Sequence, residues 1–242
     1  MEEFISKIED LYKRSTNRNI ITYTGFLTPA EKQIIINNFK TNNILFLGGA
    51  ESSERVRAFF MPDYMDKVNI DEYIVAFKAV FSFRELSHRD FLGAILSLGI
   101  ERRCVGDIYV FEKEAYFFVT SDVANFIKIN LDKVANIGVK IREIRLNEVK
   151  VLEPKFKDIE FCVASLRIDA LVAGSIRESR EKASAYIKNG TVLLNYMVCE
   201  NVSEKVEEGD VFSVKGHGKF YISEIGGVSR RGKIFIKVKQ YV

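Results

Sequence analysis

The last third of the chain contains the stretch that decides its fold, residues 166–195, which reads LRIDALVAGSIRESREKASAYIKNGTVLLN. Its apolar residues recur at helical spacing and predict a first helix that ends at Gly174. A second helix is expected to begin after Ser179, whose side chain can cap the helix N-terminus, and to end at Gly190. A short strand then follows and turns at residues 195–196.

The second of these helices carries cations in its first turn. Arg180 and Lys182 lie next to the helix N-terminus, where unpaired N–H groups and a partial positive charge favour an anion. Cations at this end oppose the helix dipole, which favours a ligand-binding role over a stabilising one. Arg180 can hold a phosphate through two parallel hydrogen bonds, and Lys182 acts as a point charge. Each cation alone is explained equally well as a solvated side chain, whereas the cluster indicates RNA.

The candidate RNA contacts lie on these two helices, on the turn that follows them and on two glycine-flanked basic loops. Asp169 is polar inside an apolar helix, and we expect it to fix a neighbouring arginine or the backbone rather than to perform catalysis. The candidates are Arg167, Arg177, Ser179, Arg180, Lys182, Lys188, Asn189, Thr191, Asn195, Lys215, Lys219, Arg230 and Arg231.

The net charge of +3 is unevenly distributed. Residues 161–242 carry 13 Lys and Arg against 9 Asp and Glu, whereas the rest of the chain carries 23 against 24. The positive excess is confined to the C-terminal third, as expected of an anion-binding module on a near-neutral body. A solvated, charged face would explain the same excess.

The middle of the chain alternates strand-like and helix-like segments. Strands are expected at 73–83, 105–111, 115–120 and 139–146, with helices capped by Ser87 and Ser121, the second helix ending at Gly138. This order is the split βαβ, ferredoxin-like arrangement, which many RNA-recognition domains share. The aromatic residues of the first and third strands either pack in the core or stack RNA bases; they are Phe77, Phe81, Tyr116 and Phe118.

The predicted fold class is α+β with three domains. Residues 1–72 form an N-terminal α/β domain, in which Thr28-Pro29-Ala30-Glu31 predicts a capping box and a proline at the first helical position. Residues 73–147 form the central ferredoxin-like, RNA-recognition-like domain. Residues 148–160 are the expected linker, and residues 161–242 form the RNA-binding domain.

The composition argues against several classes of protein. No run approaches the roughly 18 apolar residues of a membrane span. Residues 1–4 are acidic and lack the features of a signal peptide, so we expect a cytoplasmic protein. Cys104, Cys162 and Cys199 are odd in number and form no C-x-x-C pair, which predicts reduced thiols. Because the chain has only 2 His, we expect no metal site, and we expect no cofactor.

The tripeptide His88-Arg89-Asp90 suggests catalysis at first sight. The His and the Asp lie on different faces of a helix at this spacing and cannot touch directly. We therefore expect helix capping or ion pairing here. Glu54, Arg55, His88 and Arg89 form a second candidate surface for RNA or a partner protein.

Residues 165–215 resemble the S-four (alpha-L) RNA-binding domain, which occurs in a small-subunit ribosomal protein, tyrosyl-tRNA synthetases and pseudouridine synthases. The matching pattern is R-[IL]-D-x-x-L, then S-R-x-x-A-x-x-x-I-x-x-G-x-V-x-[VL]-N, then x-x-G-D. The chain departs from it at Tyr196, where the family usually has Gly. Because a positive φ would strain a Tyr, we expect a wider hairpin here.

Two upstream motifs extend the resemblance to nearly the whole chain. Residues 48–55 read GGAESSER, and residues 86–94 read LSHRDFLGA. With the C-terminal module, they resemble the bacterial YlmH family. The resemblance implies an N-terminal, an RNA-recognition-like and an S-four domain. It also implies a non-enzymatic role in rescue of stalled nascent chains, in which the protein assists alanine tailing by holding tRNA. The implied partners are large-subunit ribosomal RNA, tRNA, the large ribosomal subunit and a quality-control factor, with no membrane.

Three hypotheses stay open on the residues alone. The first is a non-enzymatic RNA-binding factor. The second is an RNA-modifying enzyme that docks through the C-terminal module, although residues 1–150 show no catalytic Asp motif, no glycine-rich nucleotide loop and no metal cluster. The third is an interaction scaffold whose N-terminal domains bind protein.

Overall fold

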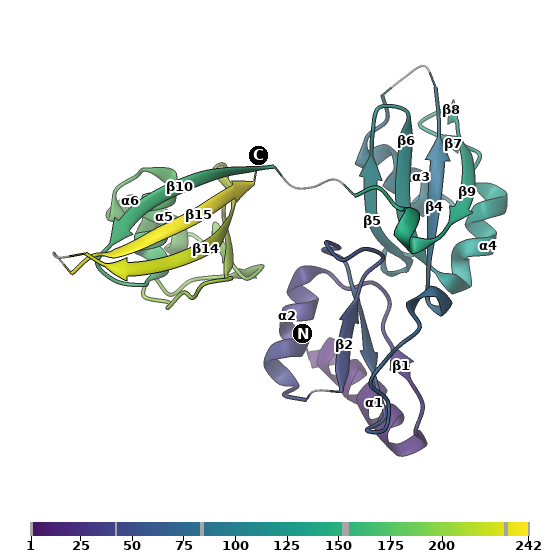
Figure 1. The fold of residues 1–242 in the computed structure, drawn as a ribbon, viewed down its shortest axis with the longest axis horizontal. Coiled ribbons are helices and arrows are strands. Elements are labelled where there is room, and N and C mark those ends of the chain that lie inside the picture. Colours follow the sequence, from purple (N-terminus) through teal and green to yellow (C-terminus); the bar gives the residue numbers. More distant parts are fainter. Residues whose placement is uncertain (1, 42, 83–84, 152–154, 230–231, 242) are drawn as a thin grey trace. The chain divides into compact units, whose positions relative to one another are not determined.

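The computed structural model describes residues 2–41, 43–82, 85–151, 155–229 and 232–241 (Figure 1). The chain folds as two compact units, Met1–Leu152 and Glu153–Val242. The predicted boundary at 72/73 lies inside the first unit. The stretch 148–160 is not entirely a linker, because strand β10 (Phe156–Val163) begins within it and pairs with β15 along its whole length.

The first unit begins with two helices and a small antiparallel sheet. The helices are α1 (Glu2–Arg18) and α2 (Pro29–Asn38), and the sheet has the order β1-β3-β2, formed by β1 (Thr22–Tyr23), β2 (Ile44–Leu47) and β3 (Arg57–Phe60). The predicted capping box of α2 is confirmed. The Thr28 hydroxyl accepts a hydrogen bond from Glu31 N at 3.2 Å, and the Glu31 carboxylate accepts one from Thr28 N at 2.7 Å.

The rest of the first unit has the predicted order strand, helix, strand, strand, helix, strand. These elements are β4 (Ile74–Val80), α3 (His88–Ser97), β5 (Val105–Val110), β6 (Glu114–Thr120), α4 (Ser121–Asn130) and β9 (Lys140–Ile144). The sheet order is β5-β6-β4-β9, and all neighbours are antiparallel. The predicted cap of α3 is confirmed, because Ser87 and Asp90 form a capping box.

Both faces of this sheet are covered. Helices α3 and α4 pack on one face, against Phe77 and Phe81. On the other face, Tyr116 and Phe118 pack with Phe26 and with Gly49, where an added Cβ would lie 2.1 Å from the Phe118 ring. The four aromatic residues that we considered for base stacking are at most 4% exposed. They are core residues, and the stacking interpretation of these rings is wrong.

Helix α4, the second helix that packs on this sheet, is shorter than predicted. It ends at Asn130 rather than at Gly138, and a hairpin follows, formed by β7 (Lys133–Val134) and β8 (Ile137–Gly138). Its two turn residues, Ala135 and Asn136, have φ values of 47° and 66°, as a tight hairpin turn requires. Ser121 is the first residue of the helix and not its cap. The N-cap is Thr120, whose side chain makes no capping bond.

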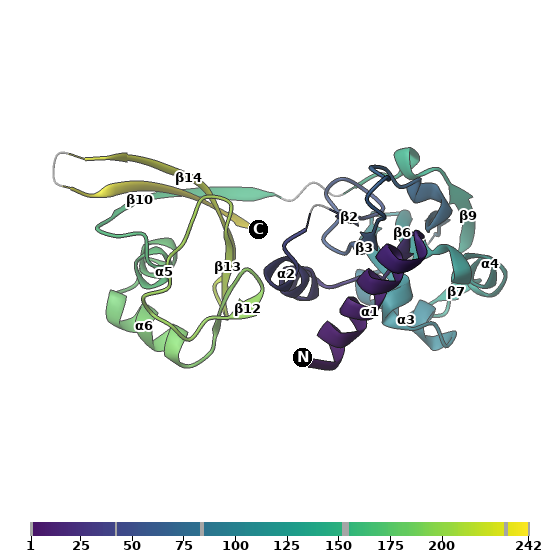
Figure 2. The same ribbon diagram turned by 90° about the horizontal axis from the view of Figure 1, so that it is seen from below.

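The second unit is a six-stranded antiparallel sheet with two helices on one face (Figure 2). After β10 come α5 (Ile168–Ile176), α6 (Arg180–Lys188), β11 (Val192–Leu194), β12 (Met197–Val198), β13 (Val211–Val214), β14 (Gly218–Val228) and β15 (Ile234–Tyr241). The strand order is β10-β15-β14-β13-β11-β12. The core contains Ile168, Leu171, Ile187, Phe212 and Ile236, each fully buried.

Two local predictions in this unit are wrong. Helix α5 continues through Gly174 and ends at Ile176, and its C-cap Arg177 adopts the left-handed conformation at φ 56°. Gly174 is instead a packing position, since an added Cβ would lie 2.3 Å from the Phe161 ring. The hairpin at Asn195 and Tyr196 is not wider, because both residues take positive φ (48° and 66°) and Leu194 pairs directly with Met197.

The packing of Gly174 leads to a stability prediction. Gly174→Ala should lower the free energy of unfolding by about 1–3 kcal/mol, because the new methyl group overlaps the Phe161 ring. Gly93→Ala in α3 is the matched control, since its Cβ would meet nothing within 4 Å, and it should raise stability by about 0.5–1 kcal/mol. Urea unfolding of both variants tests this, and equal effects would contradict the packing role of Gly174.

Candidate nucleic-acid interface

The predicted cap of α6 is confirmed. Ser179 has extended backbone, and its hydroxyl accepts a hydrogen bond from Lys182 N at 3.2 Å. The N–H groups of Arg180 and Glu181 have no acceptor inside the helix. The start of α6 therefore offers free donors and a partial positive charge to an anion.

A buried carboxylate joins this helix start to α5. Asp169 lies in the first turn of α5, is 4% exposed and accepts a hydrogen bond from Ala170 N at 2.9 Å. Its Oδ2 accepts one from Arg180 Nη2 at 2.6 Å, and both of its oxygens accept from Arg167 at 3.2 Å. The prediction that Asp169 fixes a neighbouring arginine is confirmed, and it fixes two.

The electrostatics of this contact favour the ionised carboxylate. Burial alone would raise the pKa of Asp169, but the hydrogen bonds from Arg180 and Arg167 outweigh it, so the pKa lies below its ordinary value. A group whose pKa is lowered in the folded state stabilises the fold above its unfolded pKa. That contribution is lost as the pH falls through the folded-state pKa.

The two guanidinium groups stay accessible although Asp169 holds them. The Arg167 and Arg180 side chains are 37% and 52% exposed. Arg180 gives one N–H group to Asp169, and most of its other donors remain for a ligand. One carboxylate between two guanidinium groups leaves a local excess of positive charge. A phosphate, which guanidinium binds through paired hydrogen bonds, would neutralise it.

Other predicted residues lie on α6 and at its two ends. Lys182 is exposed and pairs with Glu178 at 2.9 Å. Lys188 is the last residue of α6, Asn189 is its C-cap, and both are exposed. Arg177 is exposed in its left-handed conformation between the two helices. These cations can add phosphate contacts along one helix.

Two predicted contacts are instead engaged inside the fold. The Thr191 hydroxyl donates to Tyr186 O at 2.7 Å. The Asn195 amide donates to Asp210 at 2.8 Å and accepts from Val211 N at 3.1 Å. These bonds hold the Asn195–Tyr196 turn against β13, which explains how a turn without glycine persists.

Beside this turn lies a group of aromatic rings that sequence reasoning missed. The Lys219 ammonium lies 4.9 Å from the centre of the Tyr196 ring and 4.6 Å from that of Tyr241. The Tyr241 ring in turn contacts Phe156 at 4.9 Å. The signal was the period-two pattern of residues 234–241, whose buried Ile236 and Val238 leave Tyr241 on the opposite face.

Four predicted contacts were assigned to the basic loops, and one of them, Lys219, lies in strand β14. Lys215 is exposed directly after β13. Arg230 and Arg231 lie outside the described residues.

In the second candidate surface, Arg55 ties the N-terminal motif to the sheet. Its guanidinium donates to Val105 O at 3.1 Å and to Phe26 O at 2.9 Å, and its backbone N–H donates to Asp107. Burial lowers the pKa of Arg55 and raises that of Asp107. This arrangement is structural and leaves Arg55 few donors for RNA.

The rest of this surface lies at the start of α3. Asp90 serves the capping box, as expected, while His88 and Arg89 are exposed. Burial and the nearby Arg102 lower the pKa of His88, which favours its neutral form. Glu54 is exposed in the N-terminal motif. Within the described part of the chain, no cluster of three His, Cys, Asp or Glu side chains could hold a metal, and no helix is long and apolar enough to cross a membrane.

The chain is similar to known proteins over most of its length. Residues 70–148 match a family model described as a putative RNA-binding domain in YlmH. Over 214 residues, which are 87% of this chain and 83% of the relative, the sequence is 31% identical to the ribosome-associated protein quality control protein P2 of Bacillus subtilis (strain 168). The fold is similar to that of the cell division protein ylmH from Streptococcus pneumoniae, with a TM-score of 0.51 and 28% identity, over 61% of this chain and 92% of that one.

The matching domain and a relative that spans most of the chain agree with the motifs at residues 48–55 and 86–94. This protein belongs to the YlmH family.

Proposed function

We propose that this protein is a non-enzymatic RNA-binding factor of ribosome-associated quality control. It acts on the large ribosomal subunit and tRNA, and assists alanine tailing during rescue of stalled nascent chains. The observation that carries the proposal is the pair Arg167 and Arg180, held by one buried carboxylate at the N-terminus of α6. The name of the Bacillus relative supports the assignment to quality control.

The proposed architecture has three domains. Residues 1–72 form an N-terminal domain, residues 73–147 a ferredoxin-like, RNA-recognition-like domain, and residues 161–242 an S-four domain. The strand order β5-β6-β4-β9 and the family match at residues 70–148 support the second assignment. The Arg167–Asp169–Arg180 contact supports the third, because all three residues belong to the S-four pattern.

In the proposed mode of binding, phosphate contacts give affinity and RNA shape gives specificity. Arg167, Arg180, Lys182 and Lys188 contact the RNA backbone. The proposed partners are large-subunit ribosomal RNA, tRNA and a quality-control factor, so we infer a cytoplasmic location. Crosslinking in cells, with sequencing of the attached RNA, tests this role. Reads outside large-subunit ribosomal RNA and tRNA would reject it.

The salt dependence of RNA binding tests the site on α6. The double variant Arg180→Ala/Lys182→Ala should bind labelled tRNA more weakly, and the slope of log affinity against log salt should fall by about 0.7–0.9 per lost contact. Lys13→Ala/Arg14→Ala on α1 is the matched control. It removes the same charge from two exposed cations. Each of them pairs with an acid four residues away, as Lys182 does. Fluorescence anisotropy measures both, and equal slopes in the two variants would contradict the assignment of the site to α6.

A variant of Asp169 separates the positioning of the arginines from a simple effect of charge. Asp169→Asn removes a negative charge, which on its own should strengthen RNA binding. We expect affinity to fall roughly three- to ten-fold instead, because the two arginine side chains lose the partner that orders them before binding. Asp158→Asn is the control, since Asp158 pairs with Lys237 at 3.0 Å and is half exposed. Stronger binding by both variants would show that Asp169 does not position the arginines.

A further inference from the structure

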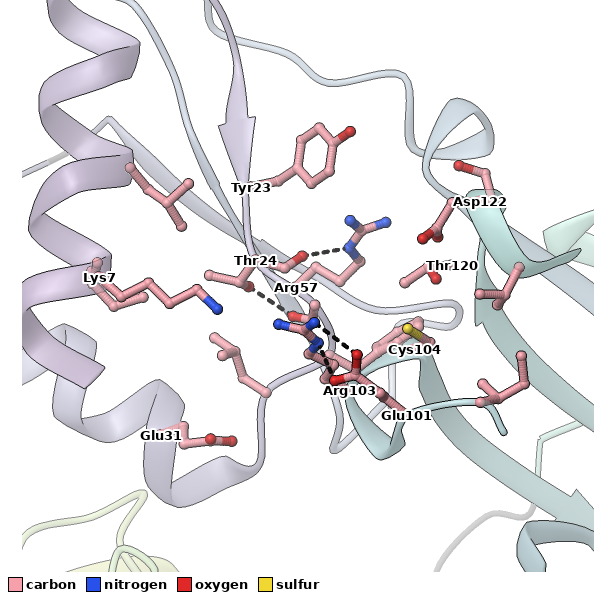
Figure 3. A pocket seen from close by; sticks show the side chains of 18 of the residues that line it. Lys7, Tyr23, Thr24, Glu31, Arg57, Glu101, Arg103, Cys104, Thr120 and Asp122 are labelled. Atoms are coloured by element: carbon pink, nitrogen blue, oxygen red, sulfur yellow. Dashed lines mark hydrogen bonds and ion pairs between the residues drawn. The ribbon is translucent and has the colours of Figure 1, made fainter. Parts of the chain in front are cut away.

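The first unit contains a cleft that the proposed function does not use. It has a volume of about 570 Å³ and lies between α1, the segment around β1 and the start of α4. Figure 3 shows Arg57 between Tyr23 and Asp122, with Thr120 beside it and Lys7 pointing in from α1. All of these residues belong to one compact unit.

Arg57 brings a buried positive charge to this cleft. It is 4% exposed, its Nε donates to Thr24 O at 2.8 Å and its Nη1 donates to Tyr73 O. Its guanidinium also lies 4.7 Å from the centre of the Tyr23 ring. Within the described residues, no carboxylate lies within ion-pair distance of Arg57. The Asp122 carboxylate attracts Arg57 from beyond ion-pair distance. A buried guanidinium without a direct ion pair is costly, and an anion in the cleft would supply that pair.

Thr120 and the start of α4 provide further donors at the same place. Thr120 is 3% exposed, and its Oγ1 is buried without a hydrogen-bond partner among the described residues. As N-cap it leaves the N–H groups of Asp122 and Val123 without a side-chain acceptor. Ser121 N donates to Tyr73 O at 3.1 Å, and Arg57 donates to the same carbonyl oxygen. The Arg57 guanidinium and the N-terminus of α4 therefore lie next to each other, on either side of the Tyr73 carbonyl oxygen.

The charges of the cleft define the ligand. Arg103 pairs with Glu101 at 2.7 Å, and Glu31 is used by the capping box of α2. The charged lining residues balance, since Lys7, Arg57 and Arg103 stand against Glu31, Glu101 and Asp122. A ligand with a single negative charge is therefore favoured over one with two. A phosphodiester carries one negative charge, whereas a terminal phosphate carries close to two at neutral pH and would be repelled by Asp122.

The size and walls of the cleft fit the group attached to such a phosphate. Its volume is in the range of small-ligand sites. Tyr23 is 44% exposed, and Phe4 and Ile100 also line the cleft, so a base would meet aromatic and apolar side chains.

We propose that this cleft binds one nucleotide of an RNA strand, with Arg57, Thr120 and the N-terminus of α4 as donors to its phosphodiester. The inference rests on the proposed RNA-binding function and adds a second contact, in the N-terminal unit. RNA then meets the protein through both units.

The test uses Thr120→Val in the full chain, because this change removes only the unpaired hydroxyl. The variant should unfold at an unchanged or higher urea concentration than the parent, since it buries no unsatisfied group. Its affinity for the dinucleotide ApA, which has one phosphodiester, should fall roughly ten-fold, as expected for a lost hydrogen bond to a charged acceptor. Thr22→Val is the matched control. Thr22 is also buried but donates to Leu11 O at 2.6 Å, so its loss should lower stability and leave ApA binding unchanged.

Nuclear magnetic resonance of the full chain locates the binding. ApA should shift the amide signals of Ser121, Asp122 and Val123, and adenosine, which has no phosphate, should not. Shifts confined to residues 155–241 would overturn the cleft and leave the proposed function standing. Tighter binding of AMP than of ApA would make the cleft a site for free nucleotides and overturn the inference. No shift with ApA, together with intact tRNA binding through α6, would also reject the cleft alone.

Discussion

The carboxylate of Asp169 is the constraint on which the C-terminal unit depends. It accepts hydrogen bonds from α5, through Ala170 N and Arg167, and from α6, through Arg180, so one buried charge fixes two helices. Removing either arginine would leave that charge less compensated, which is costly inside a protein. The same arginines are the exposed cations at the start of α6. Stability and the proposed anion binding therefore depend on the same side chains, which the carboxylate orders before a ligand arrives.

The first unit shows the opposite arrangement. Arg57 is a buried cation whose partners are carbonyl oxygens and aromatic rings, whereas Asp169 is a buried anion with two cationic partners. Carbonyl dipoles and ring faces stabilise a guanidinium but do not cancel its charge. Asp169 therefore completes a site from within the chain, whereas in the proposed cleft an added anion would give Arg57 its direct ion pair.

The sequence predicts well those local features, such as helix caps, that are determined by residues close together in the chain. The caps at Thr28, Ser87 and Ser179 are local, because each side chain bonds a backbone group three residues away. Two of the wrong predictions concern packing between distant residues. Gly174 looks like a helix end until Phe161 is seen to occupy the space of its Cβ, and Tyr196 takes a positive φ because Asn195 is bonded to Asp210 and Val211. The α6 cations were predicted from their charge pattern. Arg57 was not predicted, because the residues next to it in the chain do not reveal that its side chain is buried.

The covered sheet in the first unit limits how RNA can bind there. Ferredoxin-like RNA-binding domains stack bases on aromatic residues of an open sheet face. In this chain Tyr116 and Phe118 are buried beneath Phe26 and Gly49, so that route is closed. RNA can still bind at strand ends, at helix starts and in the cleft beside Arg57. The hydrogen-bond donors at these places are suited to phosphate rather than to base edges. Binding through such donors depends on salt and tolerates changes in sequence. That behaviour suits the proposed function, in which the shape of a large RNA is recognised through its backbone rather than through its bases.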